Sequence, residues 1–146
     1  MIKNSIFFVI ALLFSSACFA LDANDVIGKW KTVDDETGEV KSIIELYEID
    51  NVLYGKVLKI LNPAEVDNVC SKCEDNRKDQ KILGMVILKD MVWDDDQWDD
   101  GTILDPKNGS VYDCKIWLEG DDKNKLYVRG YIGFFFRTQN WYRITE

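Results

Sequence analysis

The feature that most constrains this chain is a succession of short, strand-like runs that begins at Gly28 and continues almost to the end of the sequence. The runs are rich in β-branched and aromatic residues, and no stretch of helical periodicity is long enough to compete with them. The expected strands are residues 28–34, 40–49, 52–60, 82–89, 102–104, 111–118, 125–132 and 138–145. Eight strands at this spacing predict an all-β barrel or sandwich.

Local signals refine this expectation. Asp50-Asn51 lies between two strand runs and predicts a two-residue hairpin, because both residue types tolerate positive φ. Gly55 lies inside the next run and predicts a bulge or a bend. In residues 111–118 the apolar positions alternate, which places Cys114 on the apolar face.

Residues 1–20 have the pattern of a cleavable signal peptide. Lys3 precedes nine apolar residues at 6–14, and small residues then lead to a cleavage point after Ala20. Nine apolar residues are too few to span a bilayer, which takes about 20. The alternative is a lipoprotein acylated at Cys18, but Ser15 stands where a Leu would be expected. The sequence therefore predicts one domain, residues 21–146, in a periplasmic or secreted protein.

The charge of the chain bears on its partners. The formal net charge is −8, and loss of Lys3 with the leader would make it −9. Such a charge argues against nucleic acid and against anionic membrane surfaces as partners. No segment after the leader is apolar enough for a membrane helix, and the sequence identifies no protein partner.

Histidine is absent from the sequence. This excludes a Ser-His-Asp triad, a Cys-His nucleophile and histidine-ligated metals. The sequence therefore predicts no catalytic residues, no metal and no cofactor. An enzyme that uses a thiol or carboxylates is the hypothesis ranked last.

Cys70 and Cys73 form a Cys-x-x-Cys pair in the long irregular stretch 61–80. A redox role needs a lowered thiol pKa, whereas the acidic residues at 74 and 75 would raise it. A zinc site that also uses Cys114 is the second alternative. An oxidising compartment favours a local disulfide, which leaves Cys114 as a buried free thiol or as a partner for one of the loop cysteines.

Seven short motifs occur in order along the chain. They are Gly28-x-Trp30, Leu53-Tyr54-Gly55-Lys56, Cys70-x-x-Cys73, Gly84-Met85-x-Ile87-Leu88, Ile103-Leu104-Asp105-Pro106-x-x-Gly109, Val128-Arg129-Gly130-Tyr131-Ile132-Gly133 and Gln139-x-Trp141-x-Arg143. Together they resemble the bacterial exported family known only as domain of unknown function 2147.

This resemblance implies an eight-stranded antiparallel up-and-down barrel of the lipocalin or calycin type. In such barrels Gly28 would allow a tight turn, Trp30 would plug one end, and Arg143 in the last strand would lie over the indole as a cation–π contact. These three residues are thus expected to close the barrel. The resemblance implies no activity and no ligand.

The candidate ligand-binding residues are Tyr127, Arg129 and Tyr131, which share one face of the strand 125–132. If that face points inward, the three residues could clamp a carboxylate or phosphate headgroup. If it points outward, they form an ordinary amphipathic surface. A shift of one residue in strand register reverses the answer, so the alternation leaves both orientations open.

Two further segments carry expectations. Phe134-Phe135-Phe136 cannot all be buried by alternation; a lid or core role is favoured, and the alternative is an exposed apolar patch for a partner or lipid. The acidic segment 93–101 does not match a calcium-binding loop, because Trp98 and Lys107 occupy ligand positions. It is expected to be a solvated hairpin anchored by its two tryptophans.

Three functions remain as hypotheses. The first is a barrel that binds a hydrophobic or amphipathic small molecule without catalysis, because a closed eight-stranded barrel can hold one small ligand. The second is an envelope protein-interaction module whose interior is fully packed. The third is a thiol- or carboxylate-dependent enzyme.

Overall fold

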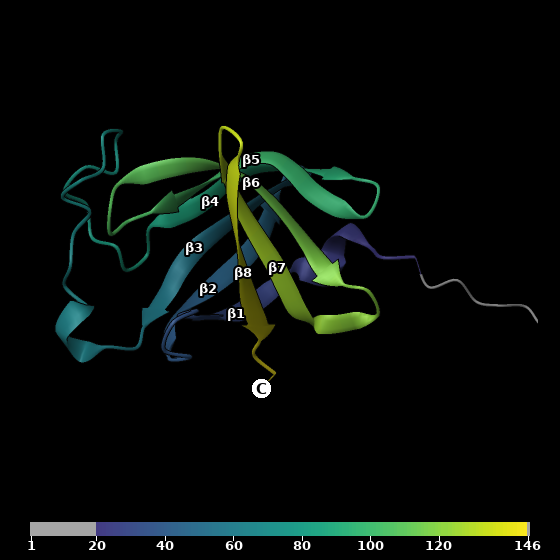
Figure 1. Ribbon diagram of the computed structural model, residues 1–146, viewed down its shortest axis with the longest axis horizontal. Coiled ribbons are helices and arrows are strands. Elements are labelled where there is room, and N and C mark those ends of the chain that lie inside the picture. The colour runs from purple at the N-terminus through teal and green to yellow at the C-terminus, as the bar shows by residue number, and fades with distance from the viewer. Residues whose placement is uncertain (1–19, 146) are drawn as a thin grey trace, which may run out of the picture.

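The computed structural model describes residues 20–145, which form a closed eight-stranded antiparallel barrel (Figure 1). Apart from Ala20, the predicted leader lies outside the described residues. The strands are β1 (Gly28–Val33), β2 (Val40–Ile49), β3 (Val52–Ile60), β4 (Val86–Asp94), β5 (Gln97–Asp105), β6 (Ser110–Glu119), β7 (Asp122–Ile132) and β8 (Phe135–Arg143). Two short 3-10 helices, η1 (Ala23–Val26) and η2 (Pro63–Glu65), complete the elements. The predicted fold class is confirmed.

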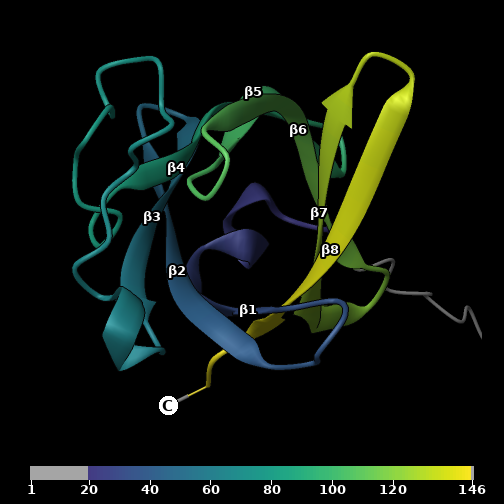
Figure 2. The same ribbon diagram turned by 60° about the vertical axis from the view of Figure 1, so that its left-hand side comes forward.

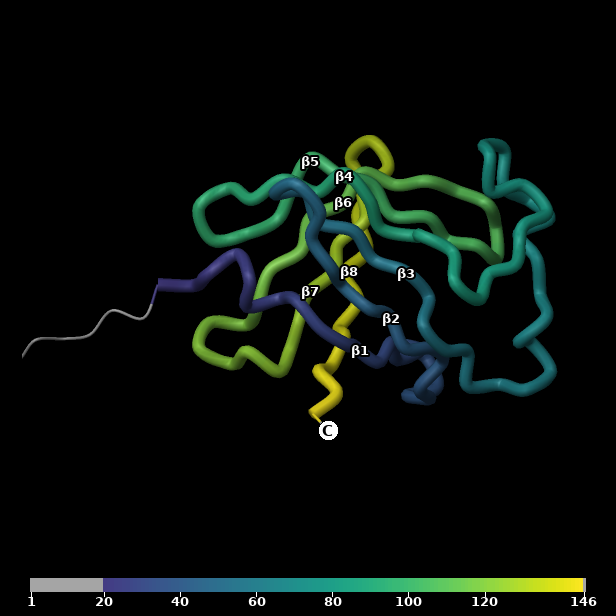
Figure 3. Tube along the Cα trace, turned by 180° about the vertical axis from the view of Figure 1, so that it is seen from behind, coloured from purple at the N-terminus to yellow at the C-terminus, as the bar shows by residue number. Residues whose placement is uncertain are grey.

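Each strand pairs with its neighbours in sequence, and β1 pairs with β8 to close the barrel. This up-and-down order divides the connections between two ends. The β2–β3, β4–β5 and β6–β7 turns lie with η1 at what we call the closed end. The β1–β2, β3–β4, β5–β6 and β7–β8 connections lie at the open end, which Figure 2 faces, with η1 visible through the ring of strands. Figure 3 shows the long β3–β4 connection and η1 at opposite ends.

The bounds of β2 and β3 match the expected strands, whereas the expected boundaries of the fourth and fifth strands are wrong. β4 begins at Val86, and the acidic segment 93–101 forms the turn and the paired ends of β4 and β5, which is the hairpin expected for it. Asp90, Asp95 and Asp100 adopt positive φ, which lets the strands bulge and turn within an acidic sequence. The two tryptophans face each other as the cross-strand pair Trp93–Trp98.

The closed-end half of the barrel is filled with side chains. The largest fully buried ones are Trp30, Trp98, Trp141, Ile44, Leu46, Leu53, Leu88, Met91, Ile116 and Leu126. Gly55 lies at register irregularities between β3 and β4, as expected for a bulge. A Cβ at Gly55 would come 2.8 Å from Leu46 Cδ2 and 3.2 Å from Leu88 Cβ, so a larger residue would force these buried side chains to shift.

η1 seals the closed end. The indole Nε1 of Trp30 donates to the Val26 carbonyl at 2.8 Å, and that of Trp98 donates to the Ala23 carbonyl at 3.2 Å. These bonds satisfy two buried indole donors and fix the helix across the barrel end. Gly28, which links η1 to β1, has a φ of 130°, a region that other residues rarely adopt.

The β3–β4 connection carries the disulfide between Cys70 and Cys73, as predicted. Both cysteines are buried. Arg77 anchors the same segment, because it pairs with Asp75 at 2.7 Å and donates to the Val86 carbonyl of β4 at 3.0 Å. The connection is therefore held against the barrel despite its lack of strands.

Among residues 20–145, no helix has the length and apolar character that crossing a membrane requires.

Candidate functional site

The open-end half of the barrel contains a cavity of about 1050 Å³. Six buried residues on six strands line it: Ile44 of β2, Val57 of β3, Ile87 of β4, Leu104 of β5, Val128 of β7 and Trp141 of β8. Further apolar side chains in the lining are Val33, Ile60, Ile82, Ile103 and Ile132. The cavity exists because the side chains that fill the barrel are concentrated near η1, at the other end.

Several of the uncharged polar groups that line the cavity come from the neighbouring strands β2, β1 and β8. Thr32 and Ser42, on β1 and β2, share a hydrogen bond between their hydroxyls at 2.8 Å. On β8 the Trp141 Nε1 donates to Gln139 Oε1 at 3.2 Å. These hydroxyl and amide groups give an otherwise apolar chamber a few positions for hydrogen bonds, a composition that is typical of small-molecule sites.

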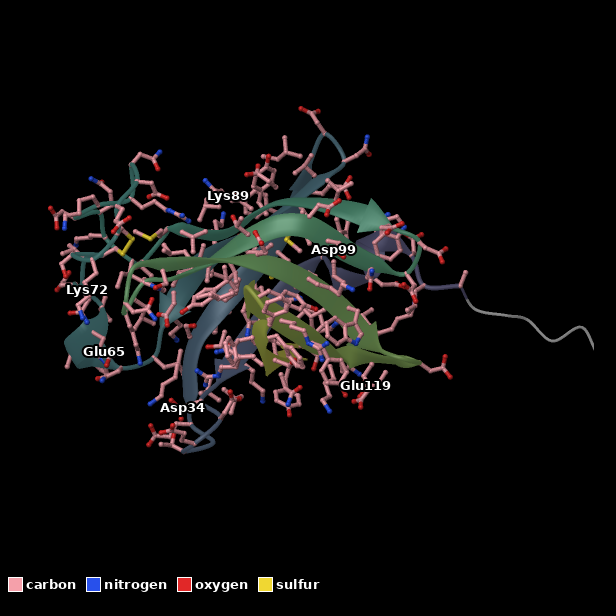
Figure 4. All side chains as sticks on the ribbon, turned by 45° about the horizontal axis from the view of Figure 1, so that its top comes forward. Asp34, Glu65, Lys72, Lys89, Asp99 and Glu119 are labelled. Carbon is pink, nitrogen blue, oxygen red and sulfur yellow. A yellow bond between two sulfur atoms is a disulfide. The ribbon has the colours of Figure 1, made fainter. Side chains whose placement is uncertain are left out.

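The rim of the cavity carries both signs of charge. Its charged residues are Asp34, Lys41, Glu65, Asp105, Lys107 and Arg137. Figure 4 shows Asp34 and Glu65 together at the open end, far from Glu119. Hydrogen bonds from the backbone N–H groups of Thr37 and Glu36 lower the pKa of Asp34, so this carboxylate is ionised at neutral pH.

The seam between β1 and β8 is joined over only part of its length. Backbone pairing runs from Trp30–Arg143 to Thr32–Trp141 and ends there. Beyond it, Arg137 of β8 reaches Asp35 of the β1–β2 connection, with Nη2 at 2.9 Å and Nε at 3.2 Å from Oδ2. The bond to Asp35 raises the pKa of Arg137. A solvent-exposed ion pair therefore spans the seam beside the cavity opening.

The three residues predicted to bind a ligand lie on the outer surface. Their strand neighbours Val128, Gly130 and Ile132 line the cavity, whereas Tyr127, Arg129 and Tyr131 do not. The structure thus has the outward orientation, and the inward clamp is corrected. The reason is register: Leu126 pairs with Trp141, and both are buried, which turns the alternate residues of β7 away from the interior.

On the outer surface, Tyr127 and Arg129 contact side chains of the neighbouring strands β6 and β8. The Tyr127 hydroxyl donates to Glu119 at 2.5 Å, and its ring stacks on Trp117. Arg129 lies over the ring of Trp117, with Cζ 4.9 Å from the centroid, and donates to Thr138 at 2.7 Å. The set is an aromatic and cationic ladder across β6, β7 and β8.

The cavity residues Arg137 and Gln139 were missed by sequence reasoning. The period of two along β8 could have identified them, because Arg137, Gln139 and Trp141 lie on the same face of the strand and that face points inward. Trp141 was available as the reference position for that face.

Among residues 20–145, none of the three cysteines has the features of a catalytic thiol. Cys70 and Cys73 are joined to each other, and Cys114 is a buried free thiol, as one of the sequence alternatives held. Burial raises the pKa of Cys114 to about 12, and the nearby Asp99 adds to the shift. Its thiol is therefore neutral and a poor nucleophile at neutral pH.

The favoured lid or core role of the three consecutive phenylalanines is wrong. Phe134, Phe135 and Phe136 are exposed at the β7–β8 turn, although Phe135 and Phe136 also border the cavity. A two-stranded hairpin projects its tip away from the barrel, so the tip cannot fold back over the opening.

No curated protein matches the chain. Among solved structures, the chain is similar to protein HP1028 from the human pathogen Helicobacter pylori, which is described as belonging to the lipocalin family. The two share 16% sequence identity with a TM-score of 0.69, over 83% of this chain and 84% of that one, which shows a common fold. A family model described as an uncharacterised protein conserved in bacteria (DUF2147) matches residues 28–143. Since this match spans the whole barrel, the protein belongs to the DUF2147 family.

Proposed function

We propose that this protein binds one hydrophobic or amphipathic small molecule in the open-end cavity and that it does so without catalysis. The observation that carries the proposal is the cavity of about 1050 Å³ with an apolar floor and a charged rim. Ligand pockets commonly span about 300–1,000 Å³, so a molecule of lipid or drug size would fit. The lipocalin-type fold supports the same proposal.

The distribution of polarity gives the proposed ligand an orientation. Its apolar part would lie against Ile44, Val57 and Val128, where burial is favourable at about 25 cal/mol per Å². Its polar end would remain among the charges of the rim, where Arg137 and Lys41 offer donors to an anionic group. The ligand would pass the seam between β1 and β8, because an exposed ion pair contributes at most about 1 kcal/mol and opens readily.

The other two hypotheses are less well supported. A protein-interaction module was expected to have a fully packed interior, and the cavity argues against that packing. A thiol-dependent enzyme would need an ionised cysteine, and the raised pKa of Cys114 argues against one.

Export from the cytoplasm is part of the proposal. A leader-like pattern at residues 1–20 and a disulfide between Cys70 and Cys73 support it, because disulfides persist mainly in oxidising compartments. Fractionation of the native host would test it: the protein should be recovered outside the cytoplasm, with Leu21 as its first residue.

Binding can be tested with the apolar fluorescent probe N-phenyl-1-naphthylamine. The probe should gain fluorescence on binding to the wild-type protein, and Ser42→Phe should reduce binding at least about tenfold because the new ring fills the cavity. Ile43→Phe is the matched control, since Ile43 is adjacent in sequence and does not line the cavity. Equal probe binding by both variants would overturn the proposal, as would a wild-type protein that binds no apolar probe.

A further inference from the structure

The tip of the β7–β8 hairpin presents an unusual concentration of large apolar side chains to solvent. The exposed fractions are 101% for Phe134, 81% for Phe135, 60% for Phe136 and 54% for Ile132. Single exposed apolar residues are common, but a contiguous group usually marks an interaction surface. Figures 1 and 2 both show the tip standing clear of the other open-end connections. We call residues 132–136 the aromatic tip.

The hairpin that carries the aromatic tip differs in charge from the rest of the protein. Residues 123–145 contain no Asp or Glu, whereas the whole chain has a net charge of −8. The basic residues of this stretch are Lys123, Lys125, Arg129, Arg137 and Arg143. Three of them pair with carboxylates outside the stretch: Lys123 with Asp25, Lys125 with Glu119 and Arg137 with Asp35. These pairs are at least partly exposed and open readily, so the hairpin is the part of the chain best able to offer cations to an anionic surface.

Two of these arginines lie beside the aromatic tip. Arg129 Cζ is 4.4 Å from the Phe136 ring centroid, and among the described residues no carboxylate forms an ion pair with Arg129. Arg137 follows the tip directly, and its side chain is 68% exposed. Aromatic rings flanked by arginines suit the boundary between lipid headgroups and acyl chains, because the rings bury there while guanidinium groups bind phosphate oxygens.

The shape of the tip favours a bilayer over a protein as its partner. Phe135 pairs with Ile132 and Phe136 pairs with Tyr131, so successive phenylalanines lie on opposite faces of the hairpin, and Phe134 occupies the turn. The result is a convex apolar projection rather than a flat face. A fluid bilayer accommodates such a projection from every side, whereas a protein partner would need a matching groove.

We propose that the aromatic tip docks the protein on phospholipid membranes, with Phe134, Phe135 and Phe136 inserted at the headgroup–acyl boundary and with Arg129 and Arg137 on lipid phosphates. Phe135, Phe136 and Ile132 also border the cavity, so apolar surface is continuous from the tip to the opening. Docking would bring the opening to the membrane. This inference goes beyond the cavity proposal and is tested independently of it, because the vesicle experiment uses no cavity probe.

The test is cosedimentation with phosphatidylethanolamine vesicles, with and without phosphatidylglycerol. All variants are prepared with the same N-terminus, so a difference in vesicle binding between them comes from the substituted residues. The wild-type protein should sediment with the vesicles, and Phe134→Ser with Phe135→Ser should reduce the partition coefficient at least about tenfold. Both side chains are exposed, so the double variant should fold normally.

The control is Ile49→Ser, which removes an exposed apolar side chain, 55% exposed, next to the closed-end β2–β3 turn. It should bind vesicles as the wild type does. Arg129→Gln should weaken binding mainly to vesicles that contain phosphatidylglycerol, and added salt should reduce this difference.

A second measurement shows directly whether the aromatic tip enters the bilayer. A Phe134→Trp variant should shift its indole emission to shorter wavelength on addition of vesicles, and lipid-borne quenchers should reduce that emission. Absence of vesicle binding by the wild type would overturn the proposal. Unchanged binding by the Phe134/Phe135 double variant would also overturn it, and loss of self-association alone in that variant would identify a second copy of the chain as the occupant.

Discussion

The guanidinium of Arg143 lies over the indole of Trp30, with Cζ 4.3 Å from the ring centroid, and the two residues are partners in the β1–β8 pairing. The same guanidinium donates to three backbone carbonyls: Nε to Lys123 at 2.9 Å, Nη1 to Ile27 at 3.0 Å and Nη2 to Asp25. One side chain therefore joins the last strand, the η1 segment and the start of β7 at the closed end.

Trp30→Ala should destabilise the protein by about 3–5 kcal/mol, because it removes a fully buried aromatic side chain and the indole bond to Val26. Urea unfolding followed by circular dichroism would measure the loss. Probe binding by the folded fraction should persist, since Trp30 does not line the cavity. A variant of wild-type stability that had lost only probe binding would contradict the structural role.

Arg143→Lys should destabilise the protein by about 1–3 kcal/mol even though it keeps the charge. Lysine lacks the planar fork that reaches three carbonyls, and carbonyls left without a donor carry a desolvation cost. Burial lowers the pKa of Arg143, but a guanidinium stays protonated under ordinary conditions. Arg137→Lys, at the exposed ion pair with Asp35, is the control and should cost less than about 1 kcal/mol. Equal urea midpoints for the two variants would contradict this account.

Cys114 should make stability fall at alkaline pH. Its folded pKa of about 12 lies above the ordinary value of 9.0, so the folded state holds the proton more tightly than the unfolded state does. This contribution is fully present below pH 9 and is lost as pH rises toward 12.

The measurement for Cys114 is the free energy of unfolding of the wild type and of Cys114→Ala from neutral pH to about pH 10. The wild type should lose stability more steeply above pH 9. Iodoacetamide should label the thiol in urea but only slowly in the native protein. Rapid native labelling would show that the thiol is accessible and ionised.

Asp75 should make the β3–β4 connection sensitive to acid. Its hydrogen bonds to the Arg77 side chain and backbone N–H lower its pKa from 3.8 to about 2. The Asp75–Arg77 pair therefore contributes to stability above pH 3.8, and this contribution is lost as pH falls through about 2. Because the carboxylate is 40% exposed, the effect should stay below about 1 kcal/mol.

Amide hydrogen exchange between pH 4 and pH 2 would measure the local stability of the segment around Asp75. Protection in residues 74–86 should fall first, ahead of the barrel strands, and Asp75→Asn should show the lower protection already at pH 4. Exchange in this segment that stays the same in wild type and variant would contradict the role of the Asp75–Arg77 pair.

The sequence by itself determined the architecture and the closure of this protein. Runs of β-branched and aromatic residues separated by turn residues specify strands locally, and the pairing of neighbours along the chain needs no distant information. The resemblance carried by Gly28-x-Trp30 and Arg143 implied the contact between the two ends of the barrel, and the oxidising compartment expected for an exported protein favoured the disulfide between Cys70 and Cys73. The strands, the turns and the disulfide depend on residue type and short separation, whereas the Trp30–Arg143 contact joins the first and last strands.

Only the tertiary structure decided which face of each strand lines the cavity. Tyr127, Arg129 and Tyr131 alternate correctly in the sequence, yet the pairing of Leu126 with buried Trp141 turns them outward and brings Arg137 and Gln139 inward. The alternation of residues along a strand shows which of them share a face, but it does not show which face points inward. The orientation is set by the register that closure imposes on all eight strands together. The cavity at the open end also depends on the register of all the strands, because that register gathers the large side chains around the closed end.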